Sequence, residues 1–242
     1  MEMKSKLMSN GFRHILCTSG LICLLFSCRQ ISPQQTSPAA MYLPLDPHDS
    51  MYLGKRDYAC DTLTQGGWKI EYLVKNDSSR YSDLYIRWYK GKDSSLYAMS
   101  SVLDLRDYFI PAYVGENETH LFLEHACASE CNALLILPKA TGSDVKSFVK
   151  VSDYNIGRGI VVYDTLPGYE WNRFELMVAD LQQNTEKTAR FSHLCYSEFG
   201  GNCLDSIVYH PQWVELHATL TDVNDPEREK QIREKITVEL RR

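Results

Sequence analysis

Histidine and cysteine recur at the same spacing in two short stretches of this 242-residue chain. In each stretch a histidine stands two positions before a cysteine, and a second cysteine follows within the next eight residues. The residues are His125, Cys127 and Cys131 in the first stretch and His193, Cys195 and Cys203 in the second. Because residues i and i+2 of a strand lie on the same side, each histidine is expected beside its first cysteine. Imidazole and thiolate groups bind zinc or copper, so the pattern allows a metal site or a thiol-redox pair.

Structural disulfides are the competing interpretation of the same cysteines, and we favour it. Cysteines in an oxidising compartment are expected to pair. Cys127 and Cys131 lie between two apolar stretches, so a hairpin would bring them to bridging distance. Cys195 and Cys203 flank a turn that contains two glycines. Cys60 is left without an assigned partner, and other pairings stay open.

The first residues of the chain have the layout of a secretory signal. Three basic residues precede an apolar stretch at residues 15–27, which is too short to span a membrane. The stretch leads into Leu-Phe-Ser-Cys at residues 25–28, which resembles the lipobox of bacterial lipoproteins. The resemblance implies that the signal is cut just before Cys28 and that the Cys28 thiol carries a diacylglycerol, which anchors the chain to a membrane.

Three segments follow from this interpretation of the N-terminus. We expect residues 1–27 to be a signal peptide, residues 28–41 a flexible tether, and residues 42–242 a single β-rich globular domain. Arg29 stands where an aspartate would retain a lipoprotein in the inner membrane, so the resemblance implies an outer-membrane anchor. Because no acidic cluster follows Cys28, we expect the domain to face the periplasm.

The domain itself has a weaker resemblance. The run from Glu124 to Cys131, followed by an apolar stretch, is similar to uncharacterised envelope lipoproteins of Bacteroidota. That resemblance brings no activity with it.

Composition and motifs narrow the function classes. The chain has 26 Lys and Arg against 31 Asp and Glu, a formal net charge of −5, which argues against a nucleic-acid partner. It contains no G-x-S-x-G, H-E-x-x-H, G-x-x-x-x-G-K-[ST] or G-x-G-x-x-G motif. We therefore expect a non-catalytic envelope protein that binds a protein or glycan and needs no cofactor. A periplasmic metal-binding or thiol-redox protein and a glycan-active enzyme are the alternatives.

Short runs that alternate between apolar and polar residues dominate the domain, and turn residues separate them. The expected strands are Trp68–Lys75, Leu84–Tyr89, Thr119–His125, Ala133–Leu137, Ser147–Val151, Gly159–Tyr163, Arg173–Val178, Ser206–Tyr209 and Trp213–Leu220. Asp225 and Pro226 form a helix-start signal ahead of a charged loop, and Lys235–Leu240 is expected to be a closing strand. The sequence predicts an all-β fold of antiparallel sheets, a sandwich or a partial propeller-like stack, with at most one short helix.

Tyrosine recurs every four residues at Tyr81, Tyr85 and Tyr89. Alternation along a strand places these rings on one face, opposite an apolar set that is expected in the core. The apolar set is Leu84, Ile86 and Trp88. Tyr169 and Trp171 add two aromatic rings in a turn. Aromatic surfaces of this kind bind proteins or glycans. Alternatively, the rings pair with side chains on neighbouring strands and only stabilise the sheet.

Overall fold

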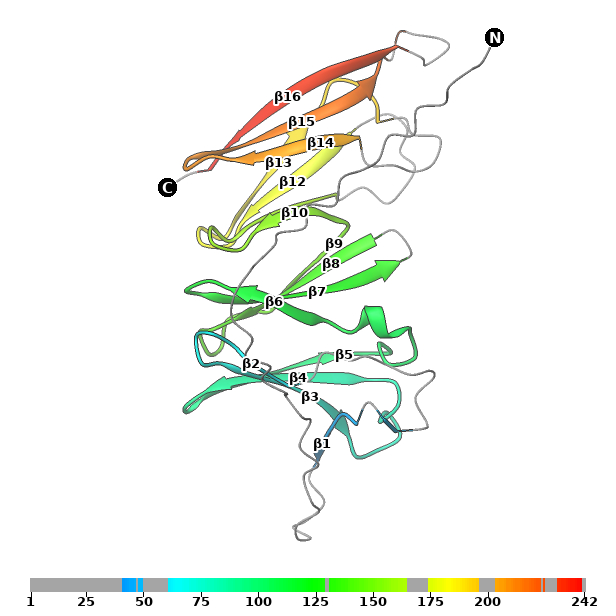
Figure 1. Ribbon diagram of the computed structural model, residues 1–242, viewed down its shortest axis with the longest axis vertical. Helices are drawn as coiled ribbons and strands as arrows, with labels where there is room; N and C mark the ends of the chain where they lie inside the picture. The colour runs from blue at the N-terminus through cyan, green and yellow to red at the C-terminus, as the bar shows by residue number, and fades with distance from the viewer. Residues whose placement is uncertain are drawn as a thin grey trace, which may run out of the picture. The chain divides into compact units, whose positions relative to one another are not determined.

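The described residues form four antiparallel sheets, each built mainly from strands that are consecutive in sequence (Figure 1). The structure is a computed structural model. It describes residues 41–46, 48–49, 61–128, 131–164, 174–195, 203–222, 224 and 230–240. All of these belong to one unit, Ala39–Arg242. The predicted all-β class is therefore confirmed.

The first two sheets, sheet A and sheet B, occupy the N-terminal part of this unit. Sheet A contains β1 (Tyr42–Pro44), β2 (Thr62–Leu63), β3 (Lys69–Lys75), β4 (Leu84–Lys90) and β5 (Asp93–Met99). Its order is β1-β3-β4-β5, and β2 also pairs with β3. Sheet B contains β6 (Ala112–Glu116), β7 (His120–Ala128), β8 (Cys131–Pro138) and β9 (Lys146–Val149), in that order. A single 3₁₀ turn among the described residues, Asp107–Phe109, lies between the two sheets in sequence.

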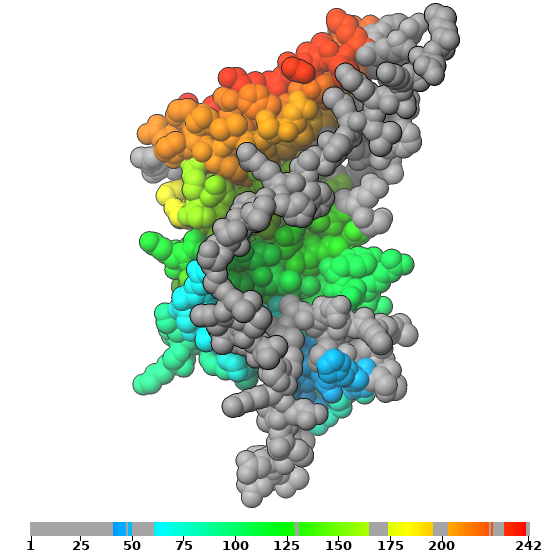
Figure 2. Space-filling view, in the orientation of Figure 1, coloured from blue at the N-terminus to red at the C-terminus, as the bar shows by residue number. Residues whose placement is uncertain are grey.

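Sheets C and D complete the fold. Sheet C contains β10 (Val151–Asn155), β11 (Ile160–Asp164), β12 (Glu175–Asp180) and β13 (Thr185–Arg190). Sheet D contains β14 (Leu204–Tyr209), β15 (Trp213–Thr221) and β16 (Gln231–Glu239). Strands follow sequence order in both sheets. The colours from cyan to red mark the same succession of sheets in a space-filling view (Figure 2).

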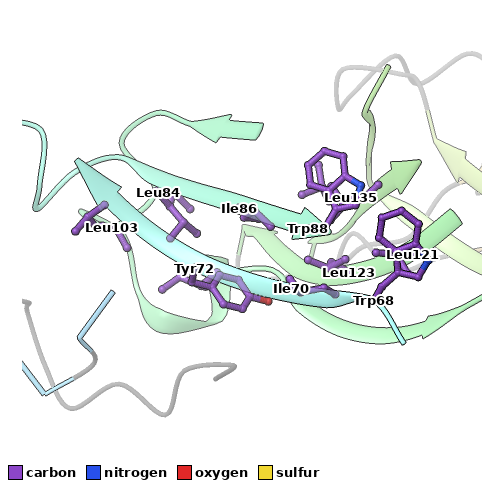
Figure 3. Close-up of a cluster of buried hydrophobic side chains, with 14 residues drawn as sticks. Trp68, Ile70, Tyr72, Leu84, Ile86, Trp88, Leu103, Leu121, Leu123 and Leu135 are labelled. Atoms are coloured by element: carbon purple, nitrogen blue, oxygen red, sulfur yellow. The ribbon is translucent and has the colours of Figure 1, made fainter. Parts of the chain in front are cut away.

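Three apolar clusters hold the sheets together face to face. The first lies between sheets A and B, where residues such as Ile70 and Ile86 meet Leu123 (Figure 3). The second joins sheets B and C through Phe122 and Val161. The third joins sheets C and D through clusters of side chains from β11, β12, β15 and β16. The packing order is therefore A, B, C, D, a stack of sheets of the kind predicted.

Sheet B is buried on both faces, and its central strand shows this in its sequence. Every residue of β8 from Ala133 to Pro138 is buried. Leu135 and Leu137 belong to the cluster with sheet A, whereas Leu134 and Ile136 belong to the cluster with sheet C. A strand that contacts a neighbour on each face needs apolar residues at successive positions, which explains the uninterrupted Ala-Leu-Leu-Ile-Leu run.

One hairpin also ties three sheets together through polar groups. Glu116, at the end of β6, accepts a hydrogen bond from the backbone N–H of Gly66 in sheet A and pairs with Lys139 at 2.7 Å. A Cβ added at Gly66 would lie 2.7 Å from the Glu116 carboxylate, so a larger residue there would make the Glu116 side chain shift. The next residue, Asn117, donates its side-chain N–H to the carbonyl oxygen of Ile156 in sheet C at 2.8 Å.

Most predicted strands shift by one to three residues at an end, and two differ in ways that the packing explains. The closing strand is confirmed, but β16 begins at Gln231 and not at Lys235, because inward and outward positions already alternate from there. The predicted strand Ser147–Val151 is divided at Lys150, whose φ of 53° is left-handed and separates β9 from β10. The chain passes from sheet B to sheet C at this residue, which makes a corner between packed sheets. Asp225 and Pro226 lie outside the described residues.

None of the helices formed by the described residues has the length and apolar character needed to cross a membrane.

Replacing Leu135 by alanine tests the core between sheets A and B. Leu135 is 1% exposed, and its deletion leaves a cavity, so we expect a loss of about 2–5 kcal/mol in the free energy of unfolding, measured by urea titration. The matched control is Leu96→Ala, since Leu96 is 44% exposed on sheet A, and we expect a change within about 0.5 kcal/mol. Equal losses in the two variants would contradict the assigned packing.

Candidate ligand face and disulfide loops

The first histidine–cysteine stretch forms the end of the β7–β8 hairpin. Cys127 and Cys131 are joined by a disulfide with their Cα atoms 5.1 Å apart, as predicted. The Nδ1 atom of His125 lies 2.9 Å from the carbonyl oxygen of Ala126, so Nδ1–H is the donor. The Nε2 atom is buried and has no hydrogen-bond partner among the described residues. Burial lowers the pKa of His125 from 6.5, because desolvation disfavours the charged ring.

The second stretch also contains a disulfide, and its histidine points to a different partner. Cys195 and Cys203 are bonded, with Cα atoms 5.6 Å apart, and both pack against the core between sheets C and D. The Nδ1 atom of His193 forms a hydrogen bond with the Glu234 carboxylate in β16. The other oxygen of Glu234 accepts the backbone N–H of Ser192 at 2.9 Å.

The two disulfides bear on the alternative interpretation of these residues as a metal site. A thiolate ligand must be a free, deprotonated sulfur, and the four sulfurs of the two stretches are in disulfide bonds. Within the described parts of the chain, no group of three or more histidine, cysteine, aspartate or glutamate residues is placed to hold a metal. Cys28 and Cys60 lie outside those parts.

The predicted aromatic face is assembled only in part. As predicted, Leu84, Ile86 and Trp88 are buried between sheets A and B. The placement of Tyr81 on the opposite face is wrong, because β4 begins only at Leu84 and Tyr81, in the preceding turn, packs against that same core.

The remaining predicted tyrosines lie on the outer face of sheet A, the face turned away from sheet B. Tyr85 is 7% exposed, since the Tyr42 ring packs on it edge to face with the ring centroids 5.0 Å apart, and Lys75 Nζ lies 5.1 Å from the Tyr85 centroid. Tyr89 donates its hydroxyl to Glu71 at 2.9 Å. Tyr169 and Trp171 are outside the described residues. The outer face of sheet A therefore does not present an open row of stacked aromatic rings.

Glu71 organises the centre of that face, a role that the sequence pattern did not predict. The residue is 7% exposed. Its Oε1 accepts Lys69 Nζ at 2.6 Å as well as the Tyr89 hydroxyl, and its Oε2 accepts Arg87 Nε at 2.8 Å together with Arg87 Nη2. Burial alone would raise the pKa of Glu71, but the hydrogen bonds from these three neighbours outweigh it and lower the pKa from 4.5.

A second acid stands beside Glu71. Thr62 pairs with Ile70 and Leu63 pairs with Lys69. Extending this register by one residue places Asp61 opposite Glu71. One oxygen of Asp61 accepts the backbone N–H of Tyr72 at 3.3 Å. Partial burial, reinforced by the charge of Glu71, raises the pKa of Asp61 above 3.8. The two neighbouring carboxyl groups therefore have pKa values displaced in opposite directions.

The outer face of sheet D has a related charge pattern but is more open to water. Glu215 accepts His217 Nε2 at 2.7 Å and lies 3.2 Å from Lys235 Nζ. The Glu215 side chain is 20% exposed, twice the 10% of Glu71. Hydrogen bonds from His217 and Lys235 lower the pKa of Glu215.

Comparisons with models of protein families, with curated proteins and with solved structures found no match to this chain.

The disulfides can be tested in the full chain by alkylation without reductant, followed by peptide mass analysis. We expect Cys127, Cys131, Cys195 and Cys203 to be protected. Replacing both cysteines of a loop by serine should lower the free energy of unfolding by about 2 kcal/mol for the first loop and about 2.6 kcal/mol for the second. Alkylation of these four residues, or a zinc or copper adduct in native mass spectrometry, would favour the metal or redox alternative.

Replacing Glu71 by glutamine tests the cluster on sheet A. The neutral amide of the variant cannot pair with the charges of Lys69 and Arg87. We therefore expect a loss of about 1–3 kcal/mol in the free energy of unfolding at pH 7. Because folding lowers the pKa of Glu71, its contribution is complete above 4.5 and disappears as pH falls through the folded-state pKa. The difference between wild type and variant should therefore shrink in acid.

The control for this titration is Glu239→Gln, since Glu239 is exposed on the outer face of sheet D. Its effect should stay within about 0.5 kcal/mol at every pH. A difference for Glu71→Gln that is constant from pH 7 to pH 3 would contradict the assigned hydrogen bonds.

Proposed function

We propose that this protein is a lipid-anchored cell-envelope protein whose β-domain is a non-catalytic binding or structural module for a protein or glycan partner. The proposal rests on one observation: hydrogen bonds and disulfide bonds already occupy the side chains that could otherwise react. Both oxygens of Glu71 accept hydrogen bonds, and the cysteines of both His-x-Cys stretches are in disulfides. Groups held in this way stabilise a surface and do not supply a free nucleophile or ligand set.

The anchor of the proposal is Cys28, in the segment that resembles a lipobox. The chain would be cut before Cys28, lipidated there, and held at the outer membrane with the domain in the periplasm. Two disulfides in the domain support this location, because disulfides persist in oxidising compartments. The predicted tether, residues 28–41, leads directly into β1 at Tyr42.

One observation favours the enzyme alternative and defines its test. Asp61 and Glu71 are neighbouring carboxyl groups with oppositely displaced pKa values, which is the arrangement of an acid–base pair. The hydrogen bonds argue for a structural role, since Asp61 accepts the backbone N–H of Tyr72 and both oxygens of Glu71 accept hydrogen bonds from neighbouring side chains.

The anchor is tested by expressing the full chain and its Cys28→Ala variant in a bacterial host. We expect wild type to gain the mass of a lipid and lose residues 1–27, and to fractionate with the outer membrane. The variant should lack the lipid, because the acylated thiol is gone. A wild-type chain without a lipid would contradict the anchor.

The non-catalytic part is tested with the same purified protein on a panel of glycoside and ester substrates. We expect no turnover above that of Asp61→Asn and Glu71→Gln chains. Turnover by wild type that either substitution abolishes, with the fold intact by circular dichroism, would establish the enzyme alternative.

A further inference from the structure

We propose that the outer face of sheet A docks onto the anionic phosphate headgroups of the membrane that holds the lipid anchor. This inference rests on the proposed anchor at Cys28. It assigns a surface to the membrane, where the proposed function assigns only a point of attachment.

Exposed apolar side chains on this face stand beside cations. Leu63 is 75% exposed and pairs across strands with Lys69. Leu96 is 44% exposed and pairs with Arg87. Cross-strand partners lie on the same face of a sheet, so each leucine has a basic neighbour about 5 Å away. Apolar groups interleaved with Lys and Arg are the composition that binds the interface of a membrane.

The cluster around Glu71 presents its positive groups outward. The side chains of Lys69 and Arg87 are 42% and 44% exposed, whereas the Glu71 side chain between them is 10% exposed. The acid therefore lies beneath the two cations and fixes their positions. Lys75, over the ring of Tyr85, adds a third cation to the same face. Fixed, outward-facing donors suit phosphate oxygens, which carry negative charge and accept hydrogen bonds.

The position of the tether points to the same face. The tether ends at Met41, which is 65% exposed, and β1 follows at Tyr42. The ring of Tyr42 contacts Tyr85 on the outer face, so the chain enters the domain at the margin of this surface. Residues 28–41 can span at most about 48 Å when fully extended, at roughly 3.4 Å per residue. A lipid at Cys28 therefore keeps this face within reach of the bilayer.

The test uses the full lipidated chain reconstituted into vesicles of phosphatidylglycerol or of phosphatidylcholine, with amine acetylation read by peptide mass analysis. We expect Lys69 and Lys75 to react at least threefold more slowly on phosphatidylglycerol vesicles. Lys235 is the matched control, because it is 57% exposed and paired with a glutamate on the outer face of sheet D. Its rate should be equal on both vesicles. Salt at about 0.5 M should remove most of the protection, since screening shortens electrostatic reach.

Two variants separate docking from simple charge attraction. Leu63→Ser/Leu96→Ser should reduce the protection of Lys69 at least twofold, whereas Val208→Ser should leave it unchanged, because Val208 is 40% exposed on sheet D. Retention of full protection in the double variant would overturn the role of the apolar residues and with it the proposal.

Other occupants of the face give distinct results. Equal labelling of Lys69 on the two vesicles overturns the proposal. Protection by soluble glycerol phosphate without vesicles, to the same degree, would show a free anion site and also overturn it. So would protection that appears only when envelope proteins are added. Intact mass shows beforehand whether Cys28 carries its lipid, so a failure of the anchor is distinguishable from a failure of docking.

Discussion

The burial of sheet B on both of its faces is the constraint on which the rest of the structure depends. A sheet that packs on two neighbours cannot carry polar groups at its centre unless they are paired, because desolvation of an unpaired group is costly. The β8 run from Ala133 to Pro138 satisfies this condition with successive buried side chains. Charged clusters are consequently found at the hairpins and on the outer faces of sheets A and D.

Polar contacts at one hairpin complement this apolar packing by fixing direction. Face-to-face packing tolerates sliding and rotation, whereas hydrogen bonds at defined positions do not. Glu116 and Asn117 are adjacent residues that reach in opposite directions, to Gly66 in sheet A and to Ile156 in sheet C. A hairpin of sheet B thus holds the sheets on both sides of it, and a side chain at Gly66 would displace the Glu116 carboxylate from its partner.

The sequence predicted the features that depend on local periodicity. The alternating pattern of β4 correctly predicted that Leu84, Ile86 and Trp88 lie in the core. The short spacing within each cysteine pair correctly predicted the two disulfides. The same alternation failed for Tyr81, because a strand's period cannot be extended through the turn before it.

Features that depend on distant partners were not predictable in this way. Strands β5 and β13 were missed because most of their residues face solvent and are polar, which leaves little apolar signal. Glu71 is a single acid in an apolar run, and its importance comes from Arg87 on the next strand. The partner of His193 is Glu234, which is 41 residues later, so a histidine beside a cysteine in sequence gave the wrong neighbour.

The outer faces of sheets A and D show how the burial of one glutamate changes the surface that a sheet exposes. Each has a glutamate between two basic side chains, with Glu71 in sheet A and Glu215 in sheet D. A buried carboxylate needs several donors to offset its desolvation, and Glu71 has them from three residues. Those donors are held in place as a result, so a ligand that meets them loses less conformational entropy on binding. Glu215 is nearer to water, where its pairs are screened and its own charge is exposed. A glutamate between two basic side chains therefore leaves two positioned, exposed cations above a buried acid on sheet A, and a more solvated acid with its partners on sheet D.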